Sequence, residues 1–174
     1  MKILKVLAIV LVVMAGKAAF AQQDSTLAQR DSAISRRNDT ALPAYLAVKD
    51  GLVKSDSVGV AAGAQKFADE MIKVRLRSHE LENLMAMKKL RADIIEEAKA
   101  MAATKNINEQ RKHFAIVSKG FWELAEKYRF IKETKVYYQQ CPMTGVTWVS
   151  NSKEIKNPYY PKNMLTCGEV KGQL

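Results

Sequence analysis

The sequence predicts a mainly α-helical fold: an antiparallel four-helix up-and-down bundle with a short C-terminal strand and turn segment packed on it. Between residues 41 and 132, apolar side chains recur at alternating spacings of three and four, which places them on one face of a helix. After residue 132, three prolines and three glycines interrupt any helical pattern. We therefore expect a single domain at 41–174, with a helical bundle at 41–132 and a C-terminal clip at 133–174.

The residues before this domain predict export. Two lysines precede an unbroken apolar run at residues 6–15, and Ala19-Phe20-Ala21 supplies small residues at −3 and −1 of a cleavage site. We expect a signal peptide at 1–21, cleaved after Ala21, then a flexible leader at 22–40 and a periplasmic mature protein. No apolar stretch reaches the about 20 residues that a membrane span requires, so no membrane span is predicted.

Each expected helix has its own apolar stripe. The first begins near residue 42, the second follows a cap at Ser55 or Asp56, and the third covers about 80–103. Asn106 and Glu109 form a capping-box pattern at the start of the fourth. The stripes are Leu42, Tyr45, Leu46, Leu52 and Val53; Val60, Ala64, Phe67, Met71 and Val74; Met87, Leu90, Ile94, Ala98 and Met101; and Phe114, Val117, Phe121, Leu124, Tyr128 and Ile131. Short connections favour antiparallel neighbours.

In the clip, β-favouring residues at 136–138 and 146–149 predict short strands, with a hairpin around Thr144-Gly145. A segment of this size cannot bury a core of its own, so it needs a disulfide, a metal ion or the bundle to hold it. Its aromatic residues are expected to pack it on the bundle. They are Tyr137, Tyr138, Trp148, Tyr159 and Tyr160.

Charge and motifs exclude several function classes. The net charge of the chain is +10, and loss of residues 1–21 removes three lysines and no acids, which leaves +7. Export argues against nucleic acid as the partner of this basic chain. We interpret the excess charge as solvated lysine-rich helix faces, with anionic lipid or an acidic protein as the alternative. The chain contains no nucleophile elbow, HExxH, phosphate-binding glycine loop or CxxC pair, so we do not expect an enzyme.

Both cysteines lie in the clip, in Cys141-Pro142-Met143 and Met164-Leu165-Thr166-Cys167. Thiolate and thioether sulfur are soft ligands that prefer Cu(I). On an extended segment, positions i and i+2 share a face, so Cys141 and Met143 could both reach one ion. On a helical turn, positions i and i+3 are neighbours, so Met164 and Cys167 could do the same. If the segments meet, four sulfurs converge. In an exported protein the same cysteines also predict a disulfide, and both interpretations stay open.

Other candidate ligands have less support. His113, near the start of the fourth helix, is a further candidate if it approaches the clip, whereas His79 is expected at an exposed helix junction. Asp93, Glu96 and Glu97 are interpreted as a solvated face of the third helix, because carboxylate metal sites in bundles need Glu-x-x-His partners on facing helices.

Six blocks of the chain carry a resemblance to a known family. They are Tyr45-Leu46-x-x-Lys49-Asp50-x-Leu52-Val53-x-Ser55-Asp56, Gln110-Arg111-x-x-Phe114-x-x-x-Ser118, Val136-Tyr137-Tyr138-x-x-Cys141-Pro142-Met143, Trp148-x-Ser150, Glu154-Ile155-x-Asn157-Pro158-Tyr159-Tyr160 and Met164-Leu165-x-Cys167-Gly168-Glu169-Val170. Together they resemble an uncharacterised family of exported proteins, common in Bacteroidetes, that is also appended to periplasmic adaptor subunits of heavy-metal efflux pumps. The Cys-Pro-Met core is similar to small metal-binding modules of copper and silver export systems.

The resemblance implies a non-enzymatic periplasmic protein that binds Cu(I) or Ag(I) for sequestration or for transfer to an efflux adaptor. The ligands it implies are Cys141, Met143, Met164 and Cys167. Pro161 departs from the family, which usually has glycine near this position, so the turn before Met164 is expected to differ. The alternative is an interaction module of the cell envelope, whose clip is clamped by a Cys141–Cys167 disulfide.

Overall fold

The computed structural model describes residue 29, residues 40–131 and residues 134–174. The expected signal peptide at 1–21, nearly all of the leader and the expected boundary between bundle and clip lie outside these residues. The chain divides into two units, and the second, residues 37–174, holds the whole predicted domain. In the part of the chain that the structure describes, none of the helices combines the length and the hydropathy that a membrane span requires.

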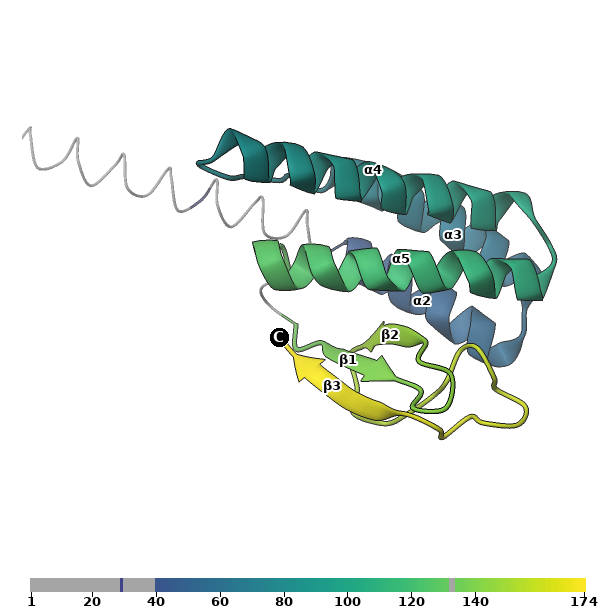
Figure 1. Cartoon of the computed structure of the whole chain (residues 1–174). Coiled ribbons are helices and arrows are strands. Elements are labelled where there is room, and N and C mark those ends of the chain that lie inside the picture. Colours follow the sequence, from purple (N-terminus) through teal and green to yellow (C-terminus); the bar gives the residue numbers. More distant parts are fainter. Residues whose placement is uncertain (1–28, 30–39, 132–133) are drawn as a thin grey trace, which may run out of the picture. The chain divides into compact units, whose positions relative to one another are not determined.

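Four helices form the bundle. They are α2 (Ala41–Lys54), α3 (Ser57–Lys73), α4 (Leu81–Ala103) and α5 (Ile107–Tyr128). Each helix packs against the next one in the chain, and the short links between them reverse the chain direction (Figure 1). The predicted mainly α-helical bundle with a C-terminal strand segment is confirmed.

Aromatic stacking joins three of the helices at the centre of the bundle. The Tyr45 ring of α2 stacks on Phe114 and Phe121 of α5, with ring centroids 5.2 and 4.7 Å away. Phe67 of α3 packs edge-on against Tyr45 and Phe121. Most residues of the four predicted stripes are buried. The half-buried exceptions are Leu46, Val53, Leu90 and Tyr128.

The predicted helix caps are formed, with two differences. Asp56 caps α3 by accepting the Gly59 N–H at 2.9 Å, whereas Ser55 ends α2 in the left-handed conformation. The Asn106 side chain caps α5, as predicted. Its own N–H donates to the Thr104 hydroxyl rather than to Glu109, whose carboxylate pairs with a lysine one turn later. Thr104 thus takes the place that the capping-box pattern assigned to Glu109.

The clip forms a three-stranded antiparallel sheet in the order β2-β1-β3. The strands are β1 (Tyr137–Gln140), β2 (Thr147–Ser150) and β3 (Glu169–Gln173). The first two form the predicted hairpin, in which Gly145 has a positive φ of 73° that favours glycine. Strand β3 was not predicted, because the sequence Glu169–Gln173 shows no apolar alternation. Its register is set by pairing with β1.

The bundle holds the clip in place. Strand β2 packs along α5 (Figure 1), and Trp148 on that strand is fully buried. The Tyr45 hydroxyl of α2 accepts the Val149 N–H at 3.0 Å, and Trp122 of α5 stacks on Tyr138 of β1 at 4.7 Å. Since these contacts anchor two strands, they also determine where the loops with the cysteines lie.

Candidate functional site

Cys141 opens the loop of the β1–β2 hairpin. Its N–H donates to the Val146 carbonyl at 2.9 Å, and its own carbonyl accepts the Gly145 N–H at 2.8 Å. Residues 142–144 form a turn directly after Cys141. Cys141 is buried, whereas Met143, inside the turn, is 75% exposed. The prediction that these two side chains share one face of an extended segment is therefore wrong. A turn, unlike a strand, does not repeat its side-chain directions every second residue.

Cys167 lies at the end of the long loop from β2 to β3, and Asn157 holds that loop together. The buried Asn157 side chain donates to the Cys167 carbonyl at 3.1 Å and accepts the Tyr159 N–H at 2.9 Å. Its backbone N–H donates to the Leu165 carbonyl at 2.8 Å. One buried amide thus fixes the backbone on both sides of the Cys167 turn.

Met164 and Cys167 bound one turn, which is not part of a helix. The Cys167 N–H donates to the Met164 carbonyl at 3.0 Å, and the Met164 N–H donates to the Tyr160 carbonyl at 2.8 Å. Pro161 lies inside this second turn. Met164 is half-buried, in contrast to the exposed Met143.

The two cysteine sulfurs lie 3.4 Å apart, although the residues are separated by 26 positions in the chain. Both are free thiols. The structure therefore brings Cys141 and Cys167 together, with Met164 in the adjoining turn. It leaves Met143 at the surface beside them.

Hydrogen bonds distinguish the two thiols. Burial raises the pKa of Cys141, but the Thr144 hydroxyl, the Cys167 thiol and the amides of Thr144 and Met143 all bond to its sulfur, and they lower the pKa below its ordinary value. The pKa of Cys167 is raised, chiefly because its thiol hydrogen-bonds to the Cys141 sulfur and because it is desolvated. Cys141 is thus the first of the pair to ionise.

Gly168 allows the chain to pass close to a tryptophan. A Cβ at this position would lie 2.9 Å from Cη2 of Trp148 and 2.8 Å from Cγ2 of Ile155, closer than side chains tolerate. The Trp148 Nε1 donates to the buried Gln139 side chain at 2.6 Å, which fixes the ring. The fixed Trp148 ring therefore packs directly against the backbone next to Cys167.

The other candidate ligands lie elsewhere. His113 Nδ1 is 2.7 Å from a carboxylate oxygen of Glu97 on α4, so this candidate histidine faces α4 rather than the clip. Asp93 and Glu96 are exposed, as a solvated face of α4 predicts, whereas Glu97 is half-buried against His113. His79 is exposed, as expected. Across residues 40–131 and 134–174, no three or more His, Cys, Asp and Glu side chains are grouped to hold a metal ion.

Comparison with known families identifies the bundle. The sequence model of the family described as Protein of unknown function (DUF3347) matches residues 41–133. The chain belongs to this family. The matched residues comprise α2 to α5, whereas the cysteine pair and the sheet follow the match. Neither the curated proteins nor the solved structures contain a match to this DUF3347 chain.

Two residues of the site were not predicted from the sequence. The Thr144 hydroxyl helps to lower the pKa of Cys141, and Asn157 holds the Cys167 loop. A hydroxyl three residues after a cysteine and an asparagine before proline were the signals available in the sequence. Both residue types are also common in turns that hold no site, so their role follows from the contacts.

Proposed function

We propose that the cysteine pair binds a monovalent soft metal ion, Cu(I) or Ag(I), and that this protein holds the ion without catalysing a reaction. The observation that supports it most is the 3.4 Å separation of the Cys141 and Cys167 sulfurs. Two thiolates form the kind of soft donor set that such ions prefer. The bound ion would be cargo, kept away from other targets or passed on.

The geometry of the pair suits a shared ion. With the metal–sulfur length of about 2.3 Å and the tetrahedral angle known from zinc thiolates, two sulfurs that share an ion lie roughly 3.8 Å apart. The observed 3.4 Å is close to this value, so a small side-chain rotation suffices. Thiols must lose their protons to bind a metal, and the hydrogen bonds from Met143 and Thr144 favour the thiolate of Cys141.

Methionine would complete the coordination. Met164 is the best-placed thioether, because it is half-buried and its carbonyl accepts the Cys167 N–H. Met143 is mostly exposed, so we assign it the role of an outer ligand that captures or releases the ion at the surface. Thioethers add soft donors without adding charge, which suits a monovalent ion.

The proposed location and partner rest on the sequence. The signal peptide predicted at residues 1–21 supports a periplasmic protein. The resemblance to domains appended to adaptor subunits of metal efflux pumps supports transfer of the ion to such an adaptor. Membership of DUF3347 supports neither point by itself, because the description of that family names no function.

Competition for Cu(I) against a chromophoric chelator tests this function. Reduced protein comprising residues 22–174 should take up one ion, Cys141→Ser should abolish tight uptake, and Met164→Leu should weaken it without unfolding the bundle. Met85→Leu is the matched control, because this exposed methionine lies on α4, outside the site. No uptake by reduced, folded wild-type protein would refute the proposal. Equal affinity of Met164→Leu and wild type would remove Met164 from the site.

The same sulfur separation supports a second candidate, an envelope interaction module clamped by a Cys141–Cys167 disulfide. A disulfide needs the sulfurs at about 2.05 Å, which rotation of the two side chains can reach from 3.4 Å. Closing a loop across these 26 positions would stabilise the fold by about 3.5 kcal/mol. Reduction should then lower the free energy of unfolding by this amount in a protein that takes up no Cu(I). Metal uptake by the reduced form favours the first candidate.

A further inference from the structure

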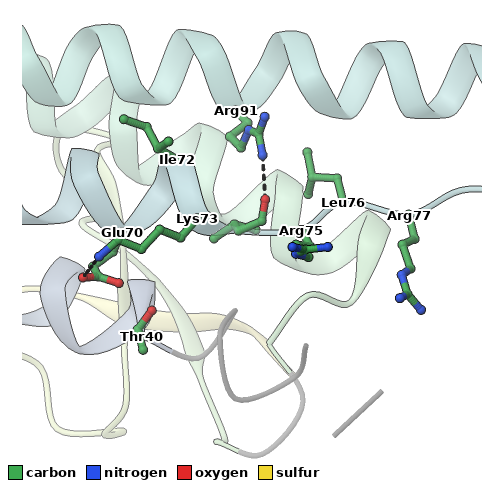
Figure 2. Close-up of a pocket in the computed structure, with 9 residues that line it drawn as sticks. Thr40, Glu70, Ile72, Lys73, Arg75, Leu76, Arg77 and Arg91 are labelled. Carbon is green, nitrogen blue, oxygen red and sulfur yellow. Dashed lines mark hydrogen bonds and ion pairs between the residues drawn. The ribbon is translucent and has the colours of Figure 1, made fainter. Parts of the chain in front are cut away.

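One end of the bundle carries two adjoining grooves, neither of which is lined by a residue of the clip. The first has a volume of about 790 Å³ and lies along the α3–α4 connection, where Figure 2 shows four basic side chains, Lys73, Arg75, Arg77 and Arg91. The second, of about 680 Å³, shares Arg77 and adds Lys127 and Arg129 at the end of α5. We call this surface the basic end.

Positive charge is concentrated at the basic end. The two grooves are lined by six basic and two acidic side chains, the acids being Glu70 and Glu80. The other described residues carry 15 basic and 12 acidic side chains, so their charge is nearly balanced. The leader at 22–39 has three basic and three acidic residues and therefore does not change the net charge.

The connection between α3 and α4 displays two of the arginines. Val74 is buried and Leu76 half-buried, while Arg75 and Arg77 between and after them are exposed. This alternation is that of an extended segment with one apolar and one polar side. Arg91 Nη1 donates to the Val74 carbonyl at 2.6 Å and so ties the segment to α4 (Figure 2). The two arginines are thus held on the outer side of an anchored segment.

Exposed apolar side chains flank the same surface. Ile72, which lines the first groove, is 53% exposed. Leu81, which follows Glu80 of the second groove in the sequence, and Met85, one turn later on α4, are 73% and 58% exposed. Residues at i and i+4 of a helix are neighbours, so Leu81 and Met85 form one apolar pair. A free anion would engage the arginines but leave these side chains in water.

We propose that the basic end docks on an anionic phospholipid surface. Guanidinium groups pair with lipid phosphates through charge-assisted hydrogen bonds, and Ile72, Leu81 and Met85 enter the boundary between headgroups and acyl chains. An anionic membrane accounts for the arginines and the apolar side chains together. This proposal does not depend on metal binding, since it involves no residue of the clip.

Vesicle flotation tests the docking. The chain comprising residues 22–174 is mixed with phosphatidylcholine vesicles that contain or lack phosphatidylglycerol. We expect binding to the anionic vesicles alone, weakened by salt because screening shortens the range of the attraction. Each basic residue near such a surface strengthens association about fivefold, so Arg75→Gln with Arg77→Gln should weaken binding roughly 25-fold.

The matched control is Lys54→Gln with Lys105→Gln. It makes the same charge change at two exposed lysines, at the end of α2 and at the link between α4 and α5. Both double variants should keep the helical circular dichroism of the wild type. Equal binding to neutral vesicles, or equal weakening in both double variants, would overturn the proposal. Binding to soluble poly-glutamate without binding to vesicles would also overturn it and identify an acidic polypeptide as the partner.

Discussion

Replacing Tyr45 by phenylalanine tests how the clip is attached to the bundle. Strand β2 is an edge of the sheet, and its Val149 N–H is satisfied by the Tyr45 hydroxyl at 3.0 Å. The same hydroxyl bonds to the Ser118 hydroxyl at 2.7 Å, and Tyr45 is fully buried. Loss of the hydroxyl leaves a buried N–H without a partner, which costs about 1–3 kcal/mol, and removes a further bond of about 1 kcal/mol. We therefore expect Tyr45→Phe to lower the free energy of unfolding by about 2–4 kcal/mol.

Urea denaturation of the reduced protein, followed by circular dichroism, measures this loss. Tyr160→Phe is the control, because Tyr160 is 39% exposed and its change should stay within about 0.5 kcal/mol. In a Ser118→Ala background the Tyr45→Phe cost should be smaller, because the Ser118 bond is already absent. The Cys141 thiol should also react faster with a thiol reagent as β2 loosens. A Tyr45→Phe cost no larger than that of Tyr160→Phe would refute this account of the attachment.

Three further predictions concern the clip. Gly168→Ala should lower the free energy of unfolding, measured by urea denaturation, by about 1–3 kcal/mol and weaken Cu(I) uptake, because the alanine Cβ would collide with Trp148. Unchanged values would contradict the close approach of the Gly168 backbone to Trp148. Thr144→Val should raise the pKa of Cys141, measured by thiolate absorbance in metal-free protein, because the hydroxyl stabilises the thiolate; no rise would exclude that bond. Arg111→Lys should lower the free energy of unfolding by about 1–3 kcal/mol in the same urea denaturation assay, because lysine cannot bond at once to the Pro158 and Leu52 carbonyls and the Ser55 hydroxyl. An unchanged free energy of unfolding would show that these three hydrogen bonds do not stabilise the fold.

The helical part of the fold was predictable from local patterns. A stripe such as Phe114, Val117 and Phe121 follows from the helical period, and the caps at Asp56 and Asn106 follow from short polar side chains at helix starts. These signals lie within a few residues of one another in the chain. Strand β3 lacked such a signal, because its place comes from pairing with β1, about thirty residues earlier.

The site, too, was predictable from the sequence only in part. The residue types of the clip identified two soft half-sites from the sequence. The helical turn considered for Met164 and Cys167 is instead a turn of the long loop. The strand geometry expected for Cys141 and Met143 was wrong, because the hairpin closes with a turn at 142–144. The contact of His113 with Glu97 likewise depends on how α4 and α5 pack.

By itself, the sequence determined the helices, the hairpin and the chemical nature of the two sulfur-containing segments, because periodicity, caps and ligand types are properties of neighbouring residues. Only the tertiary structure decided that Cys141 and Cys167 lie 3.4 Å apart. That distance depends on Asn157, on the missing side chain of Gly168 beside Trp148, and on the anchoring of β2 by Tyr45. These contacts join residues far apart in the chain, and they form only when the clip packs on the bundle.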